Sequence, residues 1–262
     1  MNDTTQQNYG LIFVEPTKED YRDNGVIRLG GAPLQPTGQW SEFLPPDEFQ
    51  AQYVETQACV TFGTLNCVEI LIRRLYGEVT NWSDRFLANI SGTQPNGNDP
   101  QRVAETLRKN GTVYQEDWPY TSDLDTWAKF YATPPYDLTV QAQAKFKGKF
   151  NFGHQWVGTD PDSMMTALTY SPLGVAVQAW TKGRDGLYKR TGGSNHWVCI
   201  YGYSKGNYWK CFDSYDNSKK RLAWDFGFDM VKQYTLEKQV LNNSGWSRAI
   251  KWFLNLFPQW GW

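Results

Sequence analysis

The sequence predicts an α+β fold, with a helical first half, a β-rich second half and a cleft between them. Apolar residues recur at helical spacing over 59–76, whereas 174–238 holds short apolar runs separated by turn residues. Chains whose helices and strands segregate in this way are typical of α+β proteins. With 262 residues, the chain is long enough to bury a substantial core.

The first 44 residues are predicted to form an extended arm. They are rich in Gly, Pro and polar residues, and show little periodicity beyond a short apolar run at 11–14. The N-terminus lacks the apolar core of a secretory leader, and no stretch has the roughly 18 consecutive apolar residues that a membrane span needs. These features leave the localisation unknown, with the cytoplasm as the default expectation.

Three helices are predicted in the first half. The strongest spans 59–76 and ends at Gly77, a residue that commonly stops helices. A second helix begins near 83–87. A third spans 100–110, where Asp99 is placed to cap the first turn.

The second half changes to the pattern of a sheet. A short helix at 163–169 leads into an apolar strand at 174–180. Two further strands, 196–203 and 208–212, are joined by a turn and form a hairpin, and 221–238 holds more strand sequence.

Cys59 is the residue with the clearest chemical context. It begins the strongest helix, and a helix N-terminus favours the thiolate form of cysteine. His196 begins a predicted strand and Asp213 follows the next one. A thiol, an imidazole that exchanges its proton and a carboxylate that orients the imidazole are what nucleophilic thiol catalysis requires. The sequence therefore predicts a cysteine hydrolase.

The remaining cysteines and the second histidine are expected to be structural. Cys67 lies among apolar residues inside the first helix and is predicted to be core. Cys199 and Cys211 lie on the two arms of the predicted hairpin, where a disulfide is geometrically allowed but less expected than two free thiols. His154 has no partner pattern and is expected at the surface or in a structural role.

The composition argues against nucleic acid as a partner but leaves contact with a protein partner or a membrane surface open. The net charge is −1 with both signs mixed along the chain, which argues against nucleic acid binding. We expect no metal and no cofactor. The aromatic-rich segment 239–262 is predicted to form a tail helix. It either docks on the body of the protein or, through 246–262, contacts a partner or a membrane surface.

Five motifs, in the same order along the chain, resemble those of the papain-like cysteine peptidases. They are Cys59-x-x-Phe62-Gly63, Asn96-Gly97-Asn98 before the third helix, Trp118-Pro119-Tyr120, Asn195-His196-Trp197-Val198, and Asp213-Ser214-Tyr215. The resemblance covers roughly 45–215. It implies a papain-like fold with a long central helix starting at the nucleophile, a catalytic domain at 45–238, a helical half at about 45–135 and a β-rich half at about 136–238.

The resemblance also implies roles for individual residues. Cys59 would be the nucleophile, His196 the general base and acid, and Asp213 the orienting residue of a peptidase that forms an acyl-enzyme. The oxyanion would be bound by the backbone N–H of Cys59 and by a glutamine side chain. Three glutamines are candidates for that position: Gln57 first, then Gln52 or Gln50.

The resemblance further implies where a polypeptide substrate would lie. Gly97 and Asn98 would line the cleft and offer backbone hydrogen bonds to an extended peptide. Ser194 and Asn195 would lie near the pocket for the side chain preceding the scissile residue. The arm before residue 45 is too short for the family's usual inhibitory prodomain, so we expect no large propeptide to be removed, although the arm could still cross the cleft.

Three departures from the family pattern leave other functions open. Val60 and Tyr215 stand where the family usually has tryptophan, and Asp213 stands where it usually has asparagine. A peptidoglycan amidase or a transglutaminase-like acyl transferase would use the same order of residues. A catalytically silent structural protein of the same fold, for instance a virion component, is the third alternative.

Overall fold

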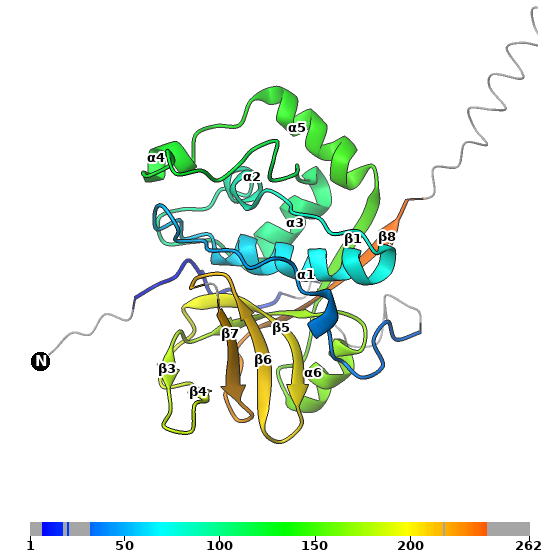
Figure 1. Ribbon diagram of the computed structural model, residues 1–262, viewed down its shortest axis with the longest axis vertical. Coiled ribbons are helices and arrows are strands. Elements are labelled where there is room, and N and C mark those ends of the chain that lie inside the picture. The colour runs from blue at the N-terminus through cyan, green and yellow to red at the C-terminus, as the bar shows by residue number, and fades with distance from the viewer. Residues whose placement is uncertain (1–6, 18–19, 21–31, 217, 240–262) are drawn as a thin grey trace, which may run out of the picture.

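A computed structural model describes residues 7–17, 20, 32–216 and 218–239 (Figure 1). It confirms the α+β prediction, with a helical layer packed on a mixed sheet. The helical elements are η1 (Ser41–Phe43), α1 (Cys59–Tyr76), α2 (Asp84–Ile90), α3 (Pro100–Asn110), α4 (Trp127–Phe130), α5 (Tyr136–Ala142), a π-helical turn η2 (Gln143–Lys147) and α6 (Pro161–Leu168). The strands are β1 (Phe150–Trp156), β2 (Leu173–Val177), β3 (Thr181–Lys182), β4 (Tyr188–Lys189), β5 (His196–Ser204), β6 (Tyr208–Asp213), β7 (Ser218–Ala223) and β8 (Val231–Lys238).

Local sequence accounts for the ends of the helices. Gly77 ends α1 in the left-handed conformation, φ 68°, and its N–H donates to the carbonyl of Arg73. Side chains cap the next two helices, because Ser83 accepts from the N–H of Phe86 and Asp99 from that of Arg102.

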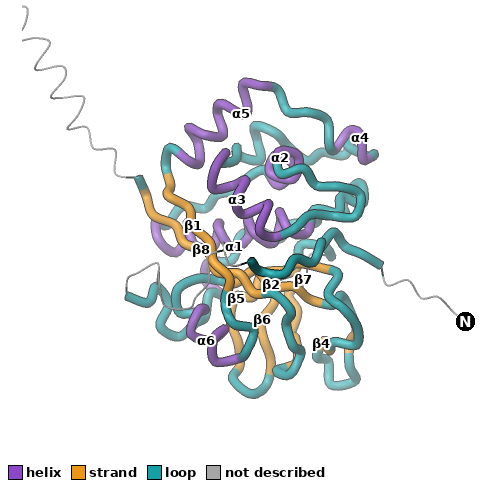
Figure 2. The backbone as a smooth tube through the Cα atoms, turned by 180° about the vertical axis from the view of Figure 1, so that it is seen from behind, coloured by secondary structure: helices purple, strands orange, loops and turns teal. Residues whose placement is uncertain are grey.

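The strands form one sheet in the order β1-β8-β2-β5-β6-β7-β4-β3. Neighbouring strands are antiparallel except β4 and β7, which are parallel. The central strands β2 and β5 are almost entirely buried, as their continuous apolar sequence predicts. Figure 2 shows β1 and β8 running past the other strands toward the helical layer.

A close approach between α1 and β5 positions the candidate site. A Cβ added at Gly63 would lie 2.8 Å from the Trp197 side chain, so only glycine lets the helix pack this near the strand. This contact holds the first turn of α1 against the first residues of β5. Cys59 and His196 are therefore brought to the same end of the interface between helix and sheet.

Several elements differ from the sequence predictions because their patterns are short. β1, α4, α5 and the two-residue strands β3 and β4 were not predicted, and the first strand of the sheet begins at Phe150. Within the described residues, no helix is both long and apolar enough to cross a membrane. The predicted tail at 239–262 lies, beyond Gln239, outside the described residues.

Candidate active site

Cys59 is the first residue of α1 and is fully buried. Its thiol accepts a hydrogen bond from the backbone N–H of Trp197, which favours the thiolate. Burial has the larger effect and raises the pKa of the thiol well above its ordinary value. In this arrangement the thiol is therefore neutral at neutral pH, in contrast to the lowered pKa that a helix N-terminus alone predicts.

His196 and Asp213 lie side by side at the same end of β5 and β6. Nε2 of His196 is 2.8 Å from Oδ1 of Asp213, and both residues are fully buried. Nδ1 of His196 has no hydrogen-bond partner among the described residues. The structure thus pairs the predicted imidazole and carboxylate through one ring nitrogen and leaves the other unpaired.

Asp213 accepts three further hydrogen bonds, two of them from side chains that the sequence did not indicate. Trp180 Nε1 donates to Oδ2 at 2.9 Å, Lys220 Nζ to Oδ2 at 2.7 Å, and the N–H of Tyr215 to Oδ1 at 3.0 Å. Burial raises the pKa of Asp213, but the charges and hydrogen bonds of His196 and Lys220 outweigh it and hold that pKa below its ordinary value. The carboxylate is therefore ionised.

Aromatic rings enclose the imidazole. The ring of Trp180 stands at 90° to that of His196 with centroids 5.9 Å apart, and Tyr215 and Tyr9 lie 5.9 and 5.4 Å away. The family's tryptophan is absent at position 215, and Trp180, which follows β2, provides an indole beside the His196–Asp213 pair instead. Its position at the end of a buried strand is the only sequence signal for it.

The described residues 7–17 of the N-terminal arm run between the helical layer and the sheet (Figure 1, dark blue). On one side, the N–H of Tyr9 donates to the carbonyl of Asn195 at 2.9 Å, and Asn195 Nδ2 donates to the carbonyl of Gln7 at 2.6 Å. On the other side, the N–H of Asn98 donates to the carbonyl of Gly10 at 3.0 Å, and the N–H of Ile12 to that of Asn98 at 2.9 Å.

Two glycines make this close fit of the arm possible. A Cβ at Gly97 would lie 2.1 Å from the carbonyl oxygen of Gly10, and one at Gly10 would lie 2.2 Å from the carbonyl oxygen of Gln57. Both have positive φ, 102° and 108°. The structure therefore places Gly97, Asn98 and Asn195 along an extended peptide, and that peptide is the protein's own arm.

Ser194 and the three glutamines have different surroundings. Ser194 donates to Asp229 Oδ2 at 2.7 Å. Gln52 is exposed and donates to the hydroxyl of Tyr53. Gln57 has φ 55°, and its side-chain oxygen is buried without a partner among the described residues.

Gln50 is the glutamine that reaches the arm. It is fully buried, its N–H donates to the carbonyl of Ser214 at 2.8 Å, and its Nε2 lies 3.5 Å from the carbonyl oxygen of Tyr9. Of the three candidates, Gln50 therefore points an N–H group at a peptide carbonyl in the cleft. The sequence named Gln50 as a candidate after Gln57, because Gln50 is the farthest of the three from Cys59 along the chain.

The other predicted structural residues are in the core. All four cysteines are free and buried, so Cys199 and Cys211 form no disulfide. The register of β5 and β6 does not place the two cysteines opposite each other. Cys199 pairs with Phe212, and Cys211 pairs with Ile200. His154 is buried rather than at the surface, with Nε2 2.9 Å from Glu105.

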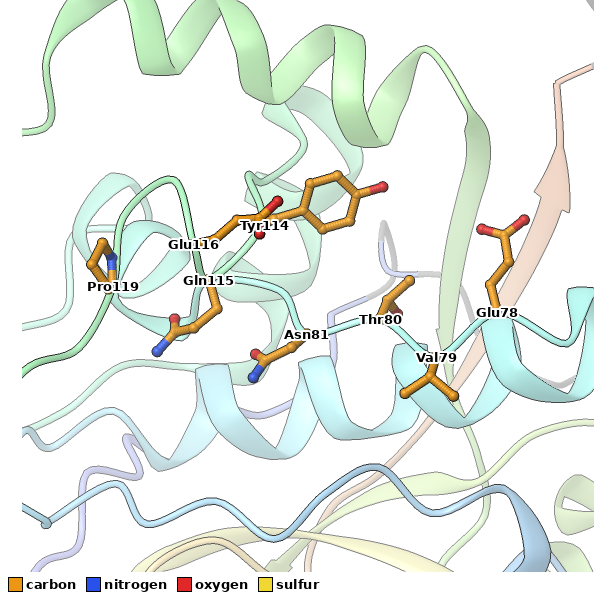
Figure 3. Close-up of a pocket in the computed structure, with 8 residues that line it drawn as sticks. All are labelled: Glu78, Val79, Thr80, Asn81, Tyr114, Gln115, Glu116 and Pro119. Carbon is orange, nitrogen blue, oxygen red and sulfur yellow. The ribbon is translucent and has the colours of Figure 1, made fainter.

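A separate cavity of about 720 Å³ lies between the segment that follows α1 and the loop that follows α3 (Figure 3). It is lined by Glu78, Val79, Thr80, Asn81, Tyr114, Gln115, Glu116 and Pro119. None of these is a predicted site residue, and the lining contains no cysteine or histidine. The cavity is therefore distinct from the site around Cys59.

Comparison with known proteins shows similarity of fold at low sequence identity. No protein-family model matches the sequence, and no curated protein does. Digestive procathepsin L 3 from the larval midgut of Tenebrio molitor is 15% identical, with TM-score 0.62 over 87% of this chain and 76% of the other. The proform of Amb a 11, a ragweed pollen cysteine protease, is 16% identical, with TM-score 0.55 over 82% and 69%.

Bromelain from Ananas comosus, solved with the inhibitor E64, is 20% identical, with TM-score 0.55 over 76% of this chain and 98% of bromelain. Each of the three matches spans most of this chain, so the likeness extends over both the helical layer and the sheet. The chain is a divergent protein with the papain-like cysteine protease fold.

Proposed function

We propose that this protein is a cysteine endopeptidase that hydrolyses peptide bonds through Cys59, His196 and Asp213. One observation carries the proposal: an extended peptide, the arm, is hydrogen-bonded through its backbone on both sides of the cleft beside these three residues. The site thus combines a surface that binds a polypeptide backbone with the residue types that thiol catalysis needs.

The reaction follows from the roles of these groups. His196 takes the thiol proton of Cys59, and the sulfur attacks the peptide carbonyl to form a tetrahedral oxyanion. The backbone N–H of Cys59 and Nε2 of Gln50 are the proposed donors to that oxygen. The imidazolium then protonates the leaving amine, leaving a thioester on Cys59. Water, deprotonated by His196, releases the acid and restores the thiol.

Asp213 has the orienting role in this scheme. Its bond to Nε2 fixes the imidazole so that Nδ1 carries out the proton exchange with Cys59. The buried carboxylate also stabilises the imidazolium that forms when the thiol ionises.

In the described arrangement the site is latent. The arm covers the imidazole through Tyr9, and burial keeps the thiol neutral. Substrate would therefore have to displace residues 7–12 from Asn98 and Asn195. Two of the three similar structures above are themselves proforms of proteases.

The test is covalent labelling by E64, the inhibitor present in the bromelain structure. The full chain is incubated with E64 between pH 5 and 7 and mapped by peptide mass spectrometry, and the Cys59→Ala variant serves as the control. We expect adducts on Cys59 alone, together with cleavage of unfolded protein that E64 abolishes. Equal labelling of Cys67, Cys199 and Cys211 would refute the proposal, and so would an unlabelled Cys59 at every pH in the Gly10→Ala variant, whose arm is displaced.

The alternative enzymes are separated by substrate. Release of stem peptides from peptidoglycan, without cleavage of unfolded protein, would identify an amidase. Incorporation of a primary amine into glutamine-containing protein would identify an acyl transferase. A folded protein that shows none of these activities and whose Cys59 does not react would identify the structural alternative.

A further inference from the structure

Lys220 places a positive charge against the carboxylate that orients His196. Its Nζ donates to Asp213 Oδ2 at 2.7 Å, and its side chain is 1% exposed. It also donates to Asp216 and to the hydroxyl of Ser218. A lysine is rarely buried to this extent unless it is paired, so the fold holds this cation at the site.

The register of β6 and β7 explains how Lys220 reaches Asp213. Asp213 pairs with Ser218 and Cys211 with Lys220, so Lys220 lies diagonally across the ladder from Asp213. Residues two apart on a strand share a face, and such diagonal neighbours are within reach of a long side chain. Trp180 and Tyr188 lie under the ammonium group at 5.1 and 5.7 Å and complete its enclosure.

The charges of the two residues cancel within the buried site. Asp213 contributes −1 and Lys220 contributes +1, so the pair is neutral overall, as is the asparagine that the family usually has at this position. A buried ion pair is costly when one partner is removed, but replacing both partners by neutral residues is well tolerated.

We propose that Lys220 is a positioning residue that offsets the charge of Asp213, so that His196 meets a nearly neutral partner and still gains an oriented hydrogen bond. The catalytic meaning of this inference rests on the proposed function. The effect of the Lys220 charge on His196 through Asp213, here called the coupling, depends only on the contacts among these three residues. Without Lys220, the uncompensated carboxylate would hold a proton on the imidazole to higher pH. His196 would then become a weaker proton donor to the leaving amine.

Other titratable groups face this network from each neighbouring element. Tyr9 of the arm and Tyr215 after β6 pack on the imidazole, and Tyr215 donates to Glu55 before α1. Asp216 bonds Lys220 directly but its side chain is 47% exposed, so solvent screens much of its charge. Three further groups complete the surroundings: Cys59 on α1, Tyr188 on β4 and Cys211 on β6.

The experiment measures the titration midpoint of the His196 imidazole by 15N NMR of the histidine-labelled full chain. All samples carry Cys59→Ala, so the result does not depend on peptidase activity. The chain has only two histidines, and the other, His154, lies on β1, separated from β7 by four strands. His154 therefore serves as an internal reference.

Four variants form a cycle: the parent, Lys220→Met, Asp213→Asn and the double variant. We expect Lys220→Met to raise the midpoint by about one pH unit or more, and Asp213→Asn to lower it by a similar amount. The double variant should lie between the two single variants. It should also unfold at a higher temperature than either of them, because neither buried charge is left unpaired.

The matched control is Lys219→Met, which removes the same charge from the neighbouring, half-exposed lysine that faces Asp47. It should leave the midpoint unchanged. A midpoint that Lys220→Met does not move, either in the parent or together with Asp213→Asn, would overturn the proposal and leave Lys220 a structural residue. Should Lys220→Met fail to fold, the comparison of Asp213→Asn with the double variant supplies the same information.

The result is separable from the proposed function. If Lys220→Met shifts the His196 midpoint but the protein with Cys59 intact cleaves no peptide, the coupling is retained and the peptidase is refuted. If the active protein cleaves peptides but Lys220→Met leaves the His196 midpoint unshifted, the peptidase is retained and the coupling is refuted.

Discussion

The backbone N–H of Tyr9 donates to the carbonyl oxygen of Asn195 at 2.9 Å, one residue before His196. Through this bond the arm pairs with the strand that carries the imidazole, while Asn98 holds it from the helical layer. The protein thus covers its own candidate site with an extended backbone. Burial raises the pKa of Cys59 in this covered site, against the thiolate-favouring effect of the helix that Cys59 begins.

Displacing the arm should make Cys59 reactive. Gly10→Ala adds a Cβ that would lie 2.2 Å from the carbonyl oxygen of Gln57 at a φ of 108°, so the arm cannot keep its place. We expect alkylation of Cys59 by iodoacetamide at pH 6 to accelerate about tenfold or more, as the open state becomes populated. Rates are measured by peptide mass spectrometry. Gly206→Ala, at a φ of 75° but with no atom within 4 Å, is the matched control. Equal rates in both variants would show that the arm does not limit access.

Removing the proposed oxyanion donor should lower the rate of the chemical step. Gln50→Ala is expected to reduce kcat about 100-fold with little change in KM, because the donor acts on charge that develops in the transition state. Gln52→Ala and Gln57→Ala are the matched controls. If either of these lost more activity than Gln50→Ala, the oxyanion assignment would move to that residue.

Removing the indole donor to Asp213 should destabilise the protein. Trp180→Phe keeps an aromatic ring but deletes the 2.9 Å bond to a charged, buried oxygen, and we expect a loss of about 2 kcal/mol in the free energy of unfolding. Trp209→Phe deletes a 3.2 Å bond to the neutral backbone carbonyl of Trp224. The part of its loss in the free energy of unfolding that comes from the hydrogen bond should be smaller. Urea unfolding of both variants checks the difference, and equal losses would contradict it.

His154 should make stability depend on pH. Burial lowers its pKa to about 4 from the ordinary 6.5. Between these values the unfolded chain binds a proton that the folded protein does not, so the free energy of unfolding falls as pH drops below 6.5. The full effect, reached below about pH 4, is about 3 kcal/mol. His154→Gln should flatten this dependence between about pH 6.5 and 5 in urea titrations. An unchanged slope would assign the acid sensitivity to other groups.

Local patterns were sufficient to predict several elements and where Cys59, His196 and Asp213 lie relative to them. Spacing of apolar residues predicted the helix 59–76, and Asp99 with Pro100 predicted the start of the next long helix. Short elements such as β3 and β4 escaped prediction because two residues carry no periodicity. For His154 the sequence left a surface and a structural position open, because its partner, Glu105, is 49 residues away.

The sequence by itself determined that Cys59 begins a long helix and that His196 and Asp213 flank two successive strands, because turn residues and periodicity act over a few neighbouring positions. The tertiary structure alone decided which side chains surround them. Trp180, Lys220 and Gln50 reach the site through strand register and through loops whose course depends on packing. The arm lies in the cleft because bonds to Asn98 and Asn195, far away in sequence, stabilise it there, and contacts of this kind leave no local pattern.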